Sequence, residues 1–185
     1  MDAALGPFRR RSKELTVSVV ALPLAGGCAC GALRYELSGR PLLVYACHCH
    51  DCQSRSGSAF TLNMVIRTAD LVTTGAEERQ EHATRNGRRV QRSLCRDCGA
   101  LVSATAPAAP AFATLPAGTL DDASWVRPVV QLFVDSAIPW AVIPGIPTVP
   151  WEAFDFEAQG LAWQSEAPDF AASPPTVTRG PMGHD

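Results

Sequence analysis

The sequence CHCHDC at residues 47–52 places three cysteines within six positions and constrains the fold more than any other segment. On either side of it, two pairs of cysteines lie in GGCACGA at 26–32 and in CRDCG at 95–99. Because seven is an odd number, these cysteines cannot all pair with one another as disulfides. Thiols at spacings of two and three residues are typical metal ligands, whereas single cysteines are more often small buried apolar residues. The cysteine pattern therefore predicts metal binding.

The seven thiols divide naturally into a group of four and a group of three, because zinc prefers four tetrahedral ligands. One ion can collect all three cysteines of 47–52 and keep its fourth position open, as catalytic zinc sites do. The pair in 95–99 is followed by a glycine and has the form of a zinc knuckle, which the pair in 26–32 could complete as a closed site. Two closed sites would need an eighth ligand, which His48 or His50 could supply.

The three cysteine groups in this order resemble the glutathione-dependent formaldehyde-activating enzyme (GFA) family, to which centromere protein V also belongs. The segment GTLDD at 118–122, and Ser136 followed by Pro139-Trp140, resemble later landmarks of that family. The resemblance covers about residues 16–157. It implies a zinc-binding, tent-like β fold of short antiparallel strands with long loops and few helical turns. It also implies two zinc ions per chain, a structural zinc on Cys28, Cys30, Cys95 and Cys98 and a catalytic zinc on Cys47, Cys49 and Cys52.

Two positions depart from the family pattern. Ala137 follows Ser136 where family members often have Lys, and Gln131 stands where many have His. Both positions lie in the C-terminal half, which helps to shape the pocket. The departures therefore do not affect the predicted zinc chemistry, but they leave the identity of the substrate undetermined.

The ligand type predicts the chemistry of the three-cysteine site. Three thiolates donate strongly to zinc and reduce its Lewis acidity, so the ion activates water less well than zinc held by three histidines. It is better suited to binding an external thiol, whose ordinary pKa of about 8.5 falls on metal coordination. Glutathione bound in this way could attack formaldehyde to give S-(hydroxymethyl)glutathione, and the reverse reaction cleaves a carbon–sulfur bond. We therefore predict a zinc-dependent carbon–sulfur lyase that acts on a glutathione adduct.

Two other functions are compatible with the cysteines. The centromere relative suggests a non-enzymatic zinc module for protein or chromatin contacts, and a thiol redox protein is disfavoured by the number and spacing of the thiols. The formal net charge is −2, and seven thiolates with two divalent ions would lower it to about −5. We therefore expect no nucleic-acid partner, because nucleic-acid binding needs a surplus of positive charge.

Residues near the cysteines have both functional and structural interpretations. Our candidate substrate-binding residues are His50, as a proton shuttle, Arg55, as a partner for a glutathione carboxylate, and Trp140, which matches a family landmark. For His48 we favour a structural role. A basic run surrounds a predicted hairpin and is most simply a solvated strand face: Arg85, Arg88, Arg89, Arg92 and Arg96.

Short strand-like stretches dominate the chain, so the predicted class is mainly β. We expect strands at 16–22, 32–37, 59–66, 101–105, 111–115, 129–134 and 141–143. Asn86-Gly87 predicts a hairpin that joins 82–85 to 88–94. Only 49–56 and 121–124 have the pattern of helical turns.

We expect residues 1–15 to be a disordered extension, 16–160 a single zinc-binding domain, and 161–185 a disordered tail rich in Pro, Ala, Ser and Thr. No apolar run reaches the roughly 18–20 residues that cross a bilayer, so we expect no membrane partner. The N-terminal segment has basic residues at 9–13 followed by a mostly apolar stretch at 15–25, a pattern that is also found in export signals. Glu14 and the β-branched composition of 15–25 argue against one, so we expect a cytoplasmic protein with reduced cysteines.

Overall fold

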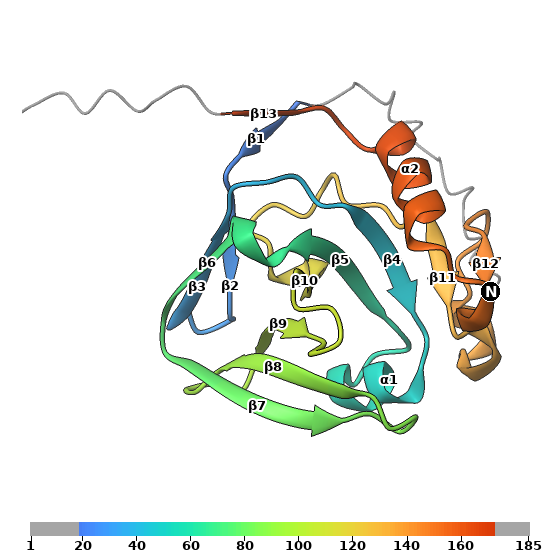
Figure 1. Ribbon diagram of the computed structural model, residues 1–185, viewed down its shortest axis with the longest axis horizontal. Helices are drawn as coiled ribbons and strands as arrows, with labels where there is room; N and C mark the ends of the chain where they lie inside the picture. Colours follow the sequence, from blue (N-terminus) through green and yellow to red (C-terminus); the bar gives the residue numbers. More distant parts are fainter. Residues whose placement is uncertain (1–18, 173–185) are drawn as a thin grey trace, which may run out of the picture.

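The computed structural model describes residues 19–172, and these form a mainly β protein, as the sequence predicts (Figure 1). Its strands are β1 (Val20–Leu22), β2 (Leu24–Gly27), β3 (Leu33–Leu37), β4 (Leu43–Cys47), β5 (Thr61–Arg67), β6 (Leu71–Gly75), β7 (Glu77–Ala83), β8 (Arg89–Cys95), β9 (Leu101–Thr105), β10 (Phe112–Pro116), β11 (Val130–Leu132), β12 (Thr148–Val149) and β13 (Phe170–Ala172). The helices are α1 (His50–Ser56) and α2 (Phe156–Glu166), with short 3-10 turns η1 (Thr68–Asp70), η2 (Ala117–Thr119), η3 (Val134–Ser136), η4 (Pro139–Ala141) and η5 (Trp151–Ala153). No helix in this part of the chain is long and apolar enough to span a membrane.

An eight-stranded sheet in the order β12-β11-β4-β5-β10-β9-β8-β7 provides the framework. A separate antiparallel sheet has the order β2-β3-β6, and β1 pairs with β13 in parallel. In Figure 1 the long sheet bends, so that β7 and β8 lie along the bottom of the view and β4 and β11 lie on the right, beside α2. The three-stranded sheet closes the left side. The chain therefore encloses its interior between two sheets.

Alternating apolar residues explain how the smaller sheet joins the core. Leu33, Tyr35 and Leu37 are buried on one face of β3, as the period of two requires. They belong to one apolar cluster with buried residues of the central strands, including Leu43 of β4 and Met64 of β5. Burial of such side chains is the main favourable term in folding, at about 1.5–3 kcal/mol each.

Gly26 allows close packing between β2 and the turn η2. The Tyr35 hydroxyl shares a hydrogen bond of 3.0 Å with the Thr119 hydroxyl, and Gly26 forms an isolated bridge with Leu120. A Cβ atom on Gly26 would overlap the Thr119 carbonyl oxygen and the Tyr35 ring. Gly26 is therefore required because a larger residue would not fit between η2 and the Tyr35 ring.

The C-terminal boundary differs from the one expected at residue 160. Residues 156–166 form α2, and 170–172 form β13, which pairs with β1. Trp163 is only 1% exposed, and its indole Nε1–H donates to the Pro41 carbonyl at 3.2 Å. Residues 161–172 thus pack as part of the fold, whereas the expectations for 1–15 and 173–185 lie outside the described residues.

Two local expectations were wrong. The segment expected to be a strand at 141–143 begins with the last residue of η4 and contains no strand, and the segment expected to be helical at 121–124 forms no helix. Pro139 begins η4, where the missing N–H of proline is tolerated. The predicted hairpin at Asn86-Gly87 is confirmed, with β7 and β8 paired over their whole length.

We predict that Gly26→Ala lowers the free energy of unfolding by about 1–3 kcal/mol, because the added Cβ forces backbone and ring apart. Gly118→Ala is the matched control, since nothing lies within 4 Å of a Cβ at that position. Chemical denaturation of both variants measures the difference. Equal stabilities would show that β2 and η2 do not pack as described.

Candidate functional site

The three-cysteine group forms where β4 ends and α1 begins. Cys47 is the last residue of β4, Cys49 is the N-cap of α1, and Cys52 lies in the first turn of that helix. Their sulfur atoms all lie within 4.8 Å of one another, and the Cys47 and Cys49 sulfurs are 3.4 Å apart. The strand-to-helix corner therefore brings three soft ligands to one point.

These three thiols are close enough to control one another's ionisation. Hydrogen bonds from the Cys47 and Cys49 thiols lower the pKa of Cys52 to about 2. The Cys49 and Cys52 thiols raise the pKa of Cys47, and burial adds to this effect. The protein groups alone thus favour one thiolate beside protonated neighbours, because like charges at this separation repel. A divalent cation removes that repulsion and lets all three sulfurs bind it as thiolates.

The four-cysteine group joins two distant turns. Cys28 and Cys30 follow β2, and Cys95 and Cys98 lie at the end of β8. The four sulfurs lie within 4.8 Å of one another, with separations of 3.4 Å from Cys30 to Cys28 and 3.7 Å from Cys30 to Cys95. Sulfurs on a tetrahedral zinc at about 2.3 Å lie about 3.8 Å apart, so these thiols fit that ion.

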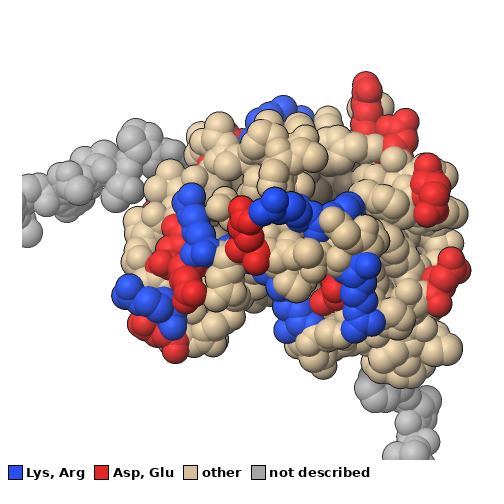
Figure 2. All heavy atoms as spheres, turned by 60° about the horizontal axis from the view of Figure 1, so that its bottom comes forward, with Lys and Arg blue, Asp and Glu red and all other residues tan. Residues whose placement is uncertain are grey.

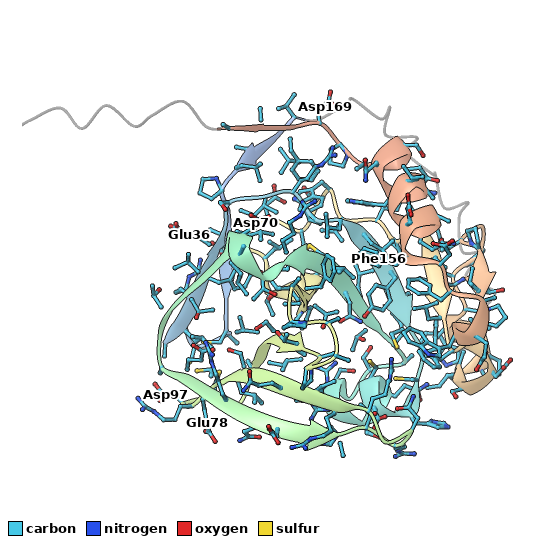
Figure 3. All side chains as sticks on the ribbon, in the orientation of Figure 1. Glu36, Asp70, Glu78, Asp97, Phe156 and Asp169 are labelled. Carbon is cyan, nitrogen blue, oxygen red and sulfur yellow. The ribbon has the colours of Figure 1, made fainter. Side chains whose placement is uncertain are left out.

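The two groups lie at opposite ends of β8. Asp97, in the turn between Cys95 and Cys98, is at the outer lower left corner in Figure 3. The other end of β8 approaches α1, which carries Cys52 (Figure 1). The sites are therefore separate, as the ligand count from the sequence requires.

A cavity of about 620 Å³ distinguishes the two groups. All three cysteines of the β4–α1 corner line it, and none of the four in the other group does. Among the described residues, no histidine or carboxylate joins the three sulfurs within 4.8 Å. The three-cysteine group thus offers three sulfur atoms beside a cavity, whereas the four-cysteine group offers four sulfur atoms, the number that tetrahedral zinc prefers.

Of the three candidate substrate-binding residues, only Arg55 lies at the cavity. Arg55 lines the cavity, and its guanidinium lies 3.8 Å from the Cys52 sulfur. His50 is exposed and is not part of the cavity lining. Trp140 is 79% exposed and also lies outside the lining, because the turn η4 presents it to solvent. Trp151, which sequence reasoning did not select, lines the cavity instead.

His48 is fully buried between two of the candidate ligands, and Gln131 fixes its ring. The Gln131 amide nitrogen donates to the carbonyl oxygens of Ile143 and Ile146 at 3.0 and 2.9 Å. Its oxygen accepts from the Ile143 N–H at 2.7 Å and from His48 Nε2 at 3.2 Å. His48 Nε2 must therefore carry a hydrogen, while Nδ1 has no partner among the described residues. This arrangement supports the structural role expected for His48.

The β7–β8 hairpin forms another wall of the cavity. Its face carries interleaved basic and acidic side chains (Figure 2), including the ion pair Arg89–Glu81. The Arg85 N–H donates to the Asp51 carboxylate at 3.0 Å, which ties the hairpin tip to α1. Arg88, Arg89 and Arg92 line the cavity. This part of the basic run is therefore not simply a solvated strand face.

Fold and site together define a mainly β protein with two thiol clusters that could hold a metal ion. The family described as glutathione-dependent formaldehyde-activating enzyme matches residues 23–136, more than half of the chain. The chain belongs to this family, which confirms the resemblance found in its cysteine motifs.

No protein of curated function matches the chain. Among solved structures, it is similar to a Rhodobacter sphaeroides protein determined as a structural genomics target. The two share 21% sequence identity with a TM-score of 0.43, over 57% of this chain and 92% of that one.

We predict that Gln131→Leu lowers the free energy of unfolding by about 3 kcal/mol, because it leaves the buried His48 ring and the part-buried backbone groups of Ile143 and Ile146 without these partners. Gln80→Leu is the control, since that exposed amide bonds only Glu78. We expect this control to change stability by less than about 0.5 kcal/mol. Denaturant titration compares them, and a small effect in both would contradict the anchoring role of Gln131.

Proposed function

We propose that this protein is a zinc-dependent carbon–sulfur lyase acting on a glutathione adduct such as S-(hydroxymethyl)glutathione. One observation carries the proposal: the three-cysteine group opens into a cavity of about 620 Å³, and the four-cysteine group does not border it. We assign a catalytic zinc to Cys47, Cys49 and Cys52. The structural zinc is assigned to Cys28, Cys30, Cys95 and Cys98.

Zinc on the three thiolates would hold the glutathione sulfur as a thiolate and so supply the nucleophile at neutral pH. The chain's own residues place the rest of the tripeptide. Arg55 and Arg92 line the cavity beside Cys52 and would pair with glutathione carboxylates. The thiol gives up one proton and the carbonyl oxygen gains one, so formation of the carbon–sulfur bond is balanced without another reactant. The reverse step returns thiol and aldehyde.

A non-enzymatic zinc module would require a permanent fourth ligand at the three-cysteine group. In the part of the chain that the structure describes, neither His48 nor His50 belongs to that group of ligand atoms. The formal charge of −2 also gives little attraction to nucleic acid. These observations favour the enzyme over the module.

We predict that glutathione adds one sulfur to the catalytic zinc. Seven protein thiols shared between two ions become eight sulfurs with bound glutathione, so X-ray absorption should show a rise from about 3.5 to about 4 sulfurs per zinc. S-methylglutathione is the control, because it has the same charges without a thiol and should leave the count unchanged. An unchanged count at saturating glutathione would refute thiol activation and leave the fold assignment intact.

We predict different outcomes for ligand loss at the two groups. Cys98→Ser weakens a cluster that ties the end of β2 to the end of β8, so stability should fall markedly, because metal binding there is coupled to folding. Cys49→Ser affects only the β4–α1 corner, so the protein should stay folded and lose activity. Thermal melts and zinc content of both variants decide the matter. Equal losses of stability would show that the two sites are not separable, and a reversed pattern would exchange their roles.

A further inference from the structure

The cavity beside the three cysteines has a second, apolar end that a one-carbon substrate does not use. It begins next to the thiols, because Leu132 of β11 lies opposite Cys47 of β4 in the sheet register. Phe133 follows directly. Its ring stacks on Trp151 with a centroid distance of 5.5 Å, and Trp151 stacks on Phe154 at 5.6 Å. We call Phe133, Trp151 and Phe154 the aromatic wall, and all three line the cavity.

A second aromatic pair extends this apolar surface. Phe156 lies at the start of α2, on the side that faces the sheet (Figure 3), and its ring is 5.4 Å from that of Phe112 in β10. Both rings line the cavity and remain more than a third exposed, at 37% and 38%. Trp151 is 39% exposed. Exposed apolar surface concentrated in a cavity indicates a binding site for an apolar group, because water is a poor partner for it.

The backbone at Phe133 is held in an unfavourable conformation. Its φ of 59° and ψ of 40° are left-handed, and it is the only described residue other than glycine with a positive φ. Aromatic residues rarely adopt this region, and such strain concentrates at functional sites. Here the conformation places an aromatic ring immediately beyond the strand position opposite Cys47. The strained residue is thus a member of the aromatic wall.

The part of the cavity next to Cys52 is positively charged. Arg55 and Arg92 both line it, and neither forms an ion pair with any residue that the structure describes. Burial and the nearby charge of Arg55 lower the pKa of the Arg92 guanidinium. Two neighbouring guanidinium groups that have no carboxylate partner among the described residues and that repel each other form a site for an anion. Arg88 also lines the cavity, and its guanidinium lies over Trp151 of the aromatic wall, 4.4 Å from the ring centroid.

We propose that the preferred carbonyl substrate is an aldehyde with an aromatic group, which the aromatic wall binds while the arginines hold the carboxylates of glutathione. The inference rests on the proposed function, since it names the substrate class of the same site. The glutathione sulfur forms a bond to the aldehyde carbon, the carbonyl π electrons move to oxygen, and the proton lost by the thiol ends on that oxygen. The product is a thiohemiacetal with the aryl group on the carbon next to sulfur.

The test compares two glutathione thioethers, S-benzylglutathione and S-methylglutathione, by calorimetry on the zinc-loaded protein. Neither has a free thiol, so their binding reports the cavity independently of thiol activation. We expect the benzyl conjugate to bind at least about tenfold more tightly, because the aryl group is removed from water against the aromatic wall. Equal affinities would overturn the proposal.

Variants then locate the preference. Trp151→Ala should remove most of the benzyl advantage while changing S-methylglutathione less than about twofold, and Trp151→Phe should retain it. Trp140→Ala is the matched control, since this exposed indole lies outside the cavity. Arg92→Gln should weaken both conjugates by the same factor. A benzyl advantage that survives Trp151→Ala would refute the aromatic wall as its source.

The same measurements separate failure of the inference from failure of the proposed function. If glutathione adds no sulfur to the zinc but the benzyl advantage and its loss in Trp151→Ala are found, thiol activation is wrong and the apolar subsite stands. If sulfur coordination rises and the two thioethers bind equally, the lyase stands and the aryl preference is wrong.

Discussion

The convergence of four thiols from two distant turns is the constraint on which the rest of the structure depends. It joins the three-stranded sheet to one end of β8, and the backbone reinforces it there. The Ala76 N–H donates to the Ala32 carbonyl at 2.8 Å, and the Arg96 N–H donates to the Ala76 carbonyl at 2.8 Å. Strand β8 also carries Arg89 and Arg92, which line the cavity. The four-thiol group at the Cys95 end of β8 therefore helps to hold the part of the cavity that this strand forms.

The sequence was informative where chemistry or periodicity is local. The strict alternation of Leu33, Tyr35 and Leu37 predicted a strand with one buried face, and the structure has it. The cysteine spacings predicted two groups of thiols, and the structure brings the sulfurs of each group within 4.8 Å. That zinc binds them, and with which roles, stays a prediction. Helix α2 was missed because only Gly160 and Trp163 are buried on it, which leaves no apolar period of 3.6 residues.

The aromatic wall could not be found from the sequence, because tertiary structure alone brings its members together. Phe133 follows β11, whereas Trp151 and Phe154 come after a loop and the short strand β12. Family landmarks pointed to Trp140, but the structure presents that side chain to solvent. Two tryptophans eleven positions apart thus differ in role because η4 faces outward and η5 faces the cavity. No local pattern distinguishes them.

Gln131 connects the departure from the family pattern to the shape of the cavity. Its amide fixes His48 on one side and the loop at 143–146 on the other, and its strand position pairs with Thr148 of β12. That strand leads directly into η5, which carries Trp151. A side chain at position 131 therefore acts on both the thiol corner and the aromatic wall without contacting a substrate. Because a histidine offers fewer hydrogen-bonding groups than this amide, a change at this one buried position alters how the loop is held, and with it the wall that the substrate meets.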